Sequence, residues 1–402
     1  MTPPLTSALR TQENILQNFK CIESLRAYMA WWVVLSHGVG LIGIYDTGSS
    51  FFNLFMKLIT WATMPVNIFI IVSGFVITHL LLNKKENYSV YITRRFFRIF
   101  PIYIFCILLA IFLANLRDIA YLDVSFLPDK SGRIATFAAQ NEHFWTHFFL
   151  HITMLHGLVP DSLLPHNTSA FLGPAWSLSL EWQFYVLAPI IIGLMARGLV
   201  PMIITTLVLY LFGLVAKSGV IGTWNYPAFL FTSIQYFLIG ILSRFIIERF
   251  KNHERIWELP IVALVTIALA NTIESLIWIG CFTIALIESR RITNVPVVIQ
   301  KVLNVFVLNK VVGNLGKWSY STYLIHLTLF SLVVGGYASI FGTDVSLKKL
   351  ILLMLSCVPI IIFASWALYS TIEVGGIALG KRVITRIKQS NDGQVTLPVS
   401  AP

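Results

Sequence analysis

Long apolar stretches recur along the chain and are separated by short segments that carry most of the charge. A helix of about 20 mostly apolar residues is long enough to cross the hydrocarbon core of a bilayer. The pattern predicts ten membrane-spanning helices, at residues 21–44, 55–82, 101–115, 174–195, 199–216, 226–247, 258–273, 274–288, 318–338 and 348–372. We therefore expect an all-α, polytopic membrane protein with about ten transmembrane helices.

The segments outside these spans differ in character. Residues 116–172 are more polar and are expected to lie outside the cell membrane, with their apolar, histidine-rich part 143–158 in the interface or re-entering it. Residues 296–316 look amphipathic and are expected to lie on the cytoplasmic surface. The predicted organisation is a cytoplasmic N-terminal segment (1–20), a transmembrane domain (21–375) and a basic, partly disordered cytoplasmic tail (376–402).

Basic residues collect between the apolar runs, mainly at 83–100, 244–255, 288–291 and 381–388. With ten spans, every one of these clusters falls on the same side of the membrane. The positive-inside rule assigns that side to the cytoplasm, together with both termini. The net charge of +11 is thus explained by topology. We expect no nucleic-acid partner, because no basic face with a groove-reading motif is present.

The composition agrees with a membrane protein. Hydrophobic residues make up 56% of the chain and charged residues 12%, whereas a soluble domain carries roughly 25% charge. The four cysteines lie in or beside apolar segments without a C-x-x-C spacing, so neither a disulfide framework nor a metal site is expected. No cleavable signal precedes the first span, which should therefore stay in the membrane.

The stretch 171–195 carries the clearest indication of function. It places a carboxylate, Glu181, about two turns into a membrane-spanning helix. An ionisable group at this depth is costly and by default marks a functional site. Ser177 lies four residues earlier on the same helix face, so both side chains can reach one ligand or each other. The alternative is a packing network in which a neighbouring helix satisfies Glu181.

The first span contains Arg26 and His37, eleven residues apart. Eleven helical steps of about 100° return nearly to the same face, about 16 Å further along the axis. Histidine is the side chain best suited to proton transfer at neutral pH. Taken singly, His37 is more readily explained as a packing histidine and Arg26 as a positively charged anchor. Their shared face favours a functional pair.

Two further segments contain candidate residues. In the sequence RRFFRIFPIY, Arg95 and Arg98 are three apart on one face of a short surface helix, which suits phosphate groups of a ligand or of lipids. Gly74, within Ser73-Gly74-Phe75, allows the close approach of a helix or a ligand. Near the end of the chain, His326 either lines the same cavity as His37 or packs between helices.

In order along the chain, these motifs resemble those of the acyltransferase-3 family of integral membrane acyltransferases. They are Arg26-x10-His37, SGF at 73–75, RRFFRIFPIY at 94–103, WSLSLEWQFY at 176–185 and GKWSYSTYLIH at 316–326. The resemblance covers roughly residues 20–375. It implies a multi-pass protein of the bacterial inner membrane. Such an enzyme moves an acyl group, commonly acetyl, from acyl-coenzyme A to a hydroxyl of a cell-surface or exported glycan or glycolipid, without a metal.

The resemblance also implies roles for individual residues. His37, Arg26 and Glu181 correspond to the catalytic group. Arg95 and Arg98 match the cytoplasmic pair that binds the donor, and we place Arg94 and Ser73 beside them. The expected substrate cavity consists of Trp176, Ser177, Ser179, Tyr323 and His326. The family often has Glu-x-Pro in its last span, whereas this chain has Glu373-Val374-Gly375. The chain stops soon after that span, as expected for the membrane module without an extracytoplasmic domain.

In this scheme His37 is the base that takes the proton of the acceptor hydroxyl. Glu181, at a similar depth, is expected to meet His37 across a cavity and to raise its basicity. A proton-coupled transporter or flippase of a glycan or lipid precursor is the main alternative, and a repeated half-structure would favour it. No repeat is evident in the sequence. A non-catalytic subunit for polysaccharide assembly is the third alternative.

Overall fold

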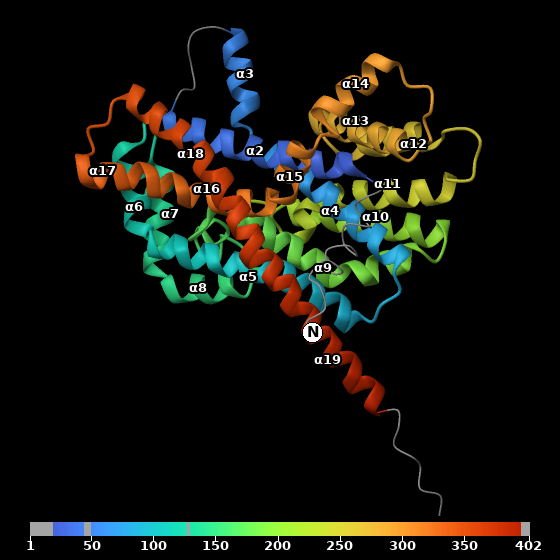
Figure 1. Ribbon diagram of the computed structural model, residues 1–402. Helices are drawn as coiled ribbons and strands as arrows, with labels where there is room; N and C mark the ends of the chain where they lie inside the picture. Colours follow the sequence, from blue (N-terminus) through green and yellow to red (C-terminus); the bar gives the residue numbers. More distant parts are fainter. Residues whose placement is uncertain (1–18, 44–49, 127–128, 395–402) are drawn as a thin grey trace, which may run out of the picture.

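The computed structural model describes residues 19–43, 50–126 and 129–394, and within these ranges every regular element is a helix (Figure 1). Eight helices are long and apolar enough to cross a bilayer, and the number rises to nine if α14 and α15, which meet at 45°, count as one broken span. The all-α, multi-pass expectation is confirmed, whereas the count of ten is not. Most of the predicted N-terminal segment, residues 1–18, lies outside the described residues.

The candidate spans share a high hydropathy and a length of at least 18 residues. They are built on α2 (Lys20–Ile42), α4 (Thr63–Asn83), α5 (Tyr88–Phe112), α9 (Trp176–Met195), α10 (Leu199–Lys217), α11 (Ile234–Phe250), α16 (Ser319–Phe330), and α18 (Leu347–Leu368) continuing into α19 (Val374–Gln394). The span on α16 ends with α17 (Gly336–Phe341). Other helices connect the spans: α3 (Ser50–Thr60), α6 (Ala114–Asp118), α7 (Ser131–Glu142), α8 (Phe144–Ile152), α12 (Glu258–Leu269), α13 (Thr272–Glu288), α14 (Val297–Phe306) and α15 (Lys310–Lys317).

Three expected spans differ from the structure in their division or their length. The run 55–82 is divided near Trp61 into α3 and α4. The runs 258–273 and 274–288 become α12 and α13, of 12 and 17 residues. At 1.5 Å per residue these helices are about 18 and 26 Å long, shorter than the roughly 30 Å hydrocarbon core.

Helix α5 begins at Tyr88 and not at Pro101, which lies inside the helix. Arg95 and Arg98 therefore belong to a membrane-spanning helix and not to a separate surface helix. A proline has no N–H group to bond the carbonyl of the residue four positions earlier, here Phe97. Helix α19 packs its Gly376 at this point, where an added Cβ atom would lie 2.7 Å from the Phe97 carbonyl oxygen. The contact fixes α19 along α5.

Helices α4 and α11 form the most extensive helix pair of the molecule. At Gly74 an added Cβ atom would lie 2.5 Å from the Phe237 carbonyl oxygen, and at Gly240 it would lie 2.0 Å from that of Ile71. Both positions must be glycine for the backbones to approach so closely. Of the two alternatives for Gly74, the structure shows the approach of a helix.

The C-terminal part continues as a helix through the first residues of the predicted cytoplasmic tail. A π-helical turn, Tyr369–Glu373, joins α18 to α19, which runs to Gln394 and extends beyond the bundle (Figure 1). Residues 395–402 lie outside the described residues. The turn places Glu373 in the interior, where it is buried.

The histidine-rich segment 143–158 folds mainly as α8, which has nine residues and is too short to cross a bilayer. Its Trp145 and Phe149 side chains are exposed. Exposed aromatic residues are typical of the membrane–water interface, so the structure favours the interfacial alternative. Figure 1 shows α6, α7 and α8 grouped at one end of the bundle.

Candidate functional site

Two cavities follow one another along α2, α4, α9 and α16. The inner cavity has a volume of about 120 Å³, and its walls include Arg26, Arg95, Arg98, Ser73 and Glu181. The outer cavity has a volume of about 880 Å³, and its walls include His37, Thr63, Pro174, Trp176 and Thr328. We call the first cavity inner because it lies toward the side that the basic loops assign to the cytoplasm, and the second outer because it lies toward the opposite side. Each helix contributes one end of its length to one cavity and the opposite part to the other.

The inner cavity has an excess of positive charge. Arg26 from α2 lies within electrostatic reach of Arg98, Glu181 and Glu373. In the described ranges, neither these two arginines nor Arg95 has a carboxylate oxygen within the 4.0 Å of an ion pair. Three guanidinium groups thus face two carboxylates without a direct pair. Such an arrangement suits a polyanionic ligand, because guanidinium groups bind phosphates through two parallel hydrogen bonds.

Arg95 is buried, and its guanidinium carbon lies 5.8 Å from the centre of the Tyr185 ring and 6.0 Å from that of Tyr91. Its Nε atom has no hydrogen-bond partner among the described residues. Arg94 turns the other way and pairs with Glu86 at 2.8 Å. Arg94 lines neither cavity, because neighbouring residues on a helix point in different directions, so the structure does not place it beside Arg95 as predicted.

Glu181 accepts hydrogen bonds from the Ser73 hydroxyl, at 3.0 Å, and from the Tyr185 hydroxyl. The first bond joins α9 to α4, and both partners lie in the wall of the inner cavity. Of the two alternatives for Ser177 and Glu181, a bond to each other does not form, because the Ser177 hydroxyl bonds the Pro174 carbonyl oxygen and the Tyr323 hydroxyl. Both residues do line the inner cavity, as reaching one ligand requires. Glu181 is thus held in the inner cavity by two hydroxyl groups.

His37 borders the outer cavity and forms no hydrogen bond with any residue in the described ranges. The expected partnership with Glu181 is therefore wrong. Its neighbour is His326, whose ring centre lies 5.3 Å away. His326 Nδ1 lies 3.2 Å from the Thr322 carbonyl oxygen, which can only accept. Nδ1 therefore carries the proton of neutral His326, and the buried Nε2, which has no hydrogen-bond partner in the described part of the chain, can accept one.

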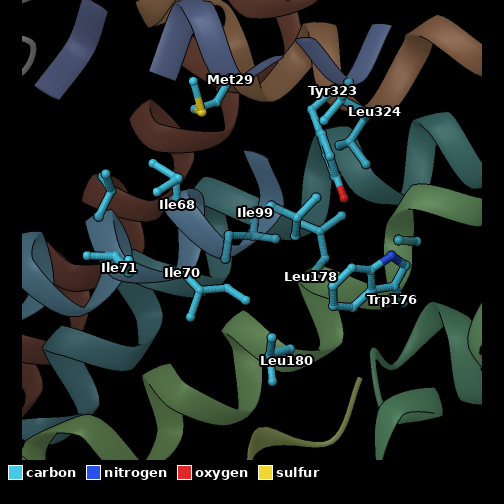
Figure 2. Close-up of a cluster of buried hydrophobic side chains, with 14 of the residues drawn as sticks. Met29, Ile68, Ile70, Ile71, Ile99, Trp176, Leu178, Leu180, Tyr323 and Leu324 are labelled. Carbon is cyan, nitrogen blue, oxygen red and sulfur yellow. The ribbon is translucent and has the colours of Figure 1, made fainter. Parts of the chain in front are cut away.

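Tyr323 and Val66 line both cavities and form the wall between them. The Tyr323 hydroxyl lies 2.9 Å from the Ser177 hydroxyl and 2.9 Å from the Pro174 carbonyl oxygen. Figure 2 shows this hydroxyl pointing from α16 toward the start of α9, which carries Trp176 and Leu178. The side chain therefore spans the space between two helices at the junction of the cavities.

Trp176 and Ser179 have different positions. Trp176 lines the outer cavity, and its ring stacks on that of Tyr226 at 5.9 Å. Ser179 is buried, donates to the Met154 carbonyl oxygen and accepts from the Gly157 N–H group at 3.0 Å. Ser179 lines neither cavity, contrary to the prediction that it belongs to the substrate cavity. Its hydrogen bonds instead hold the segment before α9 against α9.

A second histidine cluster lies outside the membrane-spanning helices. His151 and His156 stack with ring centres 4.0 Å apart, and their Nε2 atoms bond the Asn167 and Ala175 carbonyl oxygens at 2.9 and 3.2 Å. Burial lowers the pKa of His156 to about 4. Burial, with His156 as a neighbour, lowers the pKa of His151 well below its ordinary value. These neutral rings line neither cavity, and their hydrogen bonds hold together the segment between α8 and α9.

A family model described as an acyltransferase domain matches residues 19–370, which include all the helices that line the two cavities. The chain belongs to the acyltransferase-3 family. No curated protein and no solved structure shows a significant match. Membership in this family and the eight apolar helices together establish a multi-pass membrane acyltransferase.

Some residues of this acyltransferase-3 site were missed by the sequence analysis. Glu373 was noted only as a departure from a motif, yet it is buried near Arg98 and Arg26 and contacts the Ser321 hydroxyl at 3.5 Å. A carboxylate at the end of an apolar span could have indicated Glu373, just as a carboxylate inside a span indicated Glu181. The outer cavity also uses Arg117 and residues from the other connecting segments, whose fold has no simple sequence signal. The described ranges contain no group of three His, Cys, Asp or Glu residues suited to a metal ion.

Proposed function

We propose that this protein transfers an acyl group, with acetyl as the first candidate, from acyl-coenzyme A to a hydroxyl group of a cell-surface or exported glycan or glycolipid. The observation that carries the proposal is the arrangement of the two cavities. One has arginines that form no ion pair within the described ranges and that suit the donor, the other is bordered by a histidine suited to activate a hydroxyl, and they share one wall.

The inner cavity suits the donor. Coenzyme A carries several phosphate charges, which Arg26, Arg95 and Arg98 would bind with charge-assisted hydrogen bonds. The apolar side chains of Phe69 and Ile70 line the same cavity and would contact the uncharged arm that bears the thioester. In the bacterial inner membrane, with the basic loops in the cytoplasm, this cavity would take the donor from the cytoplasmic side.

The outer cavity suits the acceptor and the proton transfer. The acceptor hydroxyl oxygen attacks the thioester carbonyl carbon, and the new C–O bond forms as the C–S bond breaks. His37 takes the hydroxyl proton and then returns it to the leaving thiolate, so that coenzyme A departs as the thiol. A ring N–H group of His37 facing His326 Nε2 would leave the other nitrogen free to act as the base.

The experiment uses the purified protein in lipid nanodiscs with acetyl-coenzyme A, and follows the release of free thiol with and without extracted surface glycans. We expect glycan-dependent release that is lost in His37→Ala. Arg197→Ala, which removes an exposed arginine at the inner end of α9, serves as the control and should behave as wild type. Absence of release with every glycan fraction, together with proton-dependent glycan uptake into proteoliposomes, would establish the transporter alternative instead.

A further inference from the structure

The wall between the two cavities consists of one rigid and one movable side chain. Val66 and Tyr323 both line the inner and the outer cavity, and they are 4% and 6% exposed. A valine in a helix has essentially one side-chain conformation. Tyrosine can rotate about its Cα–Cβ bond, which moves the whole ring. Any path between the cavities at this point therefore depends on Tyr323.

A small set of hydrogen bonds holds Tyr323 in place. Three oxygen atoms lie together: the Tyr323 hydroxyl, the Ser177 hydroxyl and the Pro174 carbonyl, at mutual distances of 2.9, 2.9 and 3.3 Å. The two hydroxyl groups supply two protons, which is enough to bond the carbonyl and each other. Rotation of Tyr323 breaks only its own bonds, because Ser177 still reaches Pro174. We call the hydrogen bonds of the Tyr323 hydroxyl the latch, and these bonds can break without the rearrangement of a helix.

The neighbours of Tyr323 link the two halves of the site. Its ring meets the Phe69 ring of the inner cavity edge-on at 6.0 Å and lies 6.4 Å from the ring of His326, the neighbour of His37. A thioester bound with its phosphates at Arg95 and Arg98 lies on one side of this ring. His37 lies on the other side. The reacting atoms can meet only when the ring moves.

We propose that Tyr323 is a gate, latched by Ser177 and the Pro174 carbonyl, that opens to let the thioester meet the acceptor and otherwise keeps water from the outer cavity away from it. This inference rests on the proposed function. A leaking gate would permit hydrolysis, in which a water oxygen attacks the thioester carbon and the C–S bond breaks. The products are the carboxylic acid and the coenzyme A thiol, which takes the proton.

The test measures access to the inner cavity and does not require catalysis. Val76 lines the inner cavity only, and a Val76→Cys reporter adds one accessible thiol, since all four native cysteines are buried. The probe is the anionic, membrane-impermeant reagent methanethiosulfonate ethylsulfonate, whose charge suits a cavity lined by arginines. It is applied to spheroplasts and, separately, to inverted vesicles, so that each membrane face is probed alone.

With Tyr323 intact, we expect labelling of the reporter from the inner-cavity face alone. Tyr323→Ala should raise the labelling rate from the other face at least about tenfold. Tyr323→Phe, which keeps the ring and removes the latch, should raise it several-fold. Tyr103→Phe is the matched control, because Tyr103 is also buried, donates to the His151 carbonyl oxygen at 2.9 Å and lines neither cavity. It should leave the rate unchanged.

Equal labelling from the second face in Tyr323→Ala and in the intact gate would overturn the proposal, and so would equal labelling from both faces in the intact protein. If Tyr323→Ala does not fold, Tyr323→Phe against Tyr103→Phe decides the question. The companion measurement is thiol release from acetyl-coenzyme A without glycan, which should rise in the Tyr323 variants. Changed labelling with no acetyl-coenzyme A turnover in any variant would uphold the gate and refute acetyl-coenzyme A as the donor.

Discussion

Two pairs of neighbouring histidines differ in ring geometry and in access to a cavity. In His151–His156 the rings are nearly parallel, both Nε2 atoms bond backbone carbonyl oxygens, and neither ring reaches a cavity. In His37–His326 the rings are tilted by 30° and further apart. His37 borders the outer cavity without a hydrogen bond in the described part of the chain, whereas each of the other three rings has one nitrogen on a backbone carbonyl oxygen.

The comparison teaches that the surroundings of a histidine, and not its depth or its number of neighbours, indicate its function. A ring nitrogen committed to a backbone carbonyl stabilises the fold and cannot exchange a proton with a ligand. A ring that borders a cavity and is oriented by a second histidine can exchange a proton with a ligand. The two pairs therefore predict opposite results when they are altered.

The largest effect is expected for His37→Ala. Loss of a positioned general base lowers the rate by roughly 10²–10⁴-fold. Thiol release from acetyl-coenzyme A with a glycan acceptor should fall by this factor at equal amounts of folded protein. The matched change, His156→Ala, should lower the thermal midpoint and leave the rate per folded molecule close to wild type. Near-normal turnover in a well-folded His37→Ala protein would remove His37 from the catalytic role.

The arginines of the inner cavity should show the next largest effect. A hydrogen bond to a charged group contributes about 1.5–3 kcal/mol, so Arg95→Ala and Arg98→Ala should each weaken coenzyme A binding by roughly 10–100-fold. The measurement is calorimetric titration with coenzyme A at two ionic strengths. Arg94→Ala, which removes the partner of Glu86, should bind normally. Unchanged binding in both cavity variants would leave these arginines as lipid anchors.

The second histidine pair should make stability depend on pH. The folded-state pKa values of His151 and His156 are lowered, the latter to about 4. In the unfolded chain histidine titrates near 6.5. As the pH falls from about 6.5 toward 4, only the unfolded state takes up the proton, so each ring costs about 1.4 kcal/mol of stability per pH unit. Above pH 6.5 this loss is absent.

Unfolding midpoints between pH 4 and 8 test this dependence. His156→Gln can still donate to the Ala175 carbonyl oxygen but cannot titrate. The slope of the unfolding free energy against pH below 6.5 should therefore decrease by the contribution of about one proton. His253→Gln, at an exposed histidine, is the control and should leave the slope as it is. A slope that His156→Gln does not alter would show that the stacked pair is protonated in the fold.

The smallest effect is expected for Glu181→Gln. Glu181 lies in the inner cavity with Ser73 and Tyr185 as partners and forms no bond with His37. An amide can still accept both hydrogen bonds. The pH at which the rate is half-maximal should therefore move by less than about 0.3 unit, well below the shift of one unit or more that an adjacent opposite charge produces. A downward shift of a full unit would restore the Glu181–His37 pair.

Much of the fold follows from the sequence, where hydropathy is uniform. The predicted spans 21–44 and 199–216 agree closely with α2 and α10. The errors arise where a single residue changes the chain locally. Pro101 was taken as a helix start and lies inside α5, and the predicted span 55–82 is divided near Trp61 into α3 and α4. Hydropathy averaged over a window does not detect such breaks.

The site was predictable as a set of residues but not as an arrangement. Motif spacing brought forward Arg26, Arg95, Arg98 and Glu181, which line one cavity together. The separation of His37 from Glu181 was not predictable, because the position of a residue along its own helix does not determine which neighbouring helix its side chain meets. That choice depends on packing, such as the approach of α4 and α11. The role of Glu373 depends on the π-helical turn that places it inside.

The most direct test of the central claim is mass spectrometry of surface glycans from cells in which the protein is replaced by His37→Ala or by His156→Ala, at matched amounts in the membrane. The account predicts that an acyl mass present with the wild-type protein disappears with His37→Ala, as it does when the protein is deleted, and persists with His156→Ala. Persistence of that mass with His37→Ala would contradict the account.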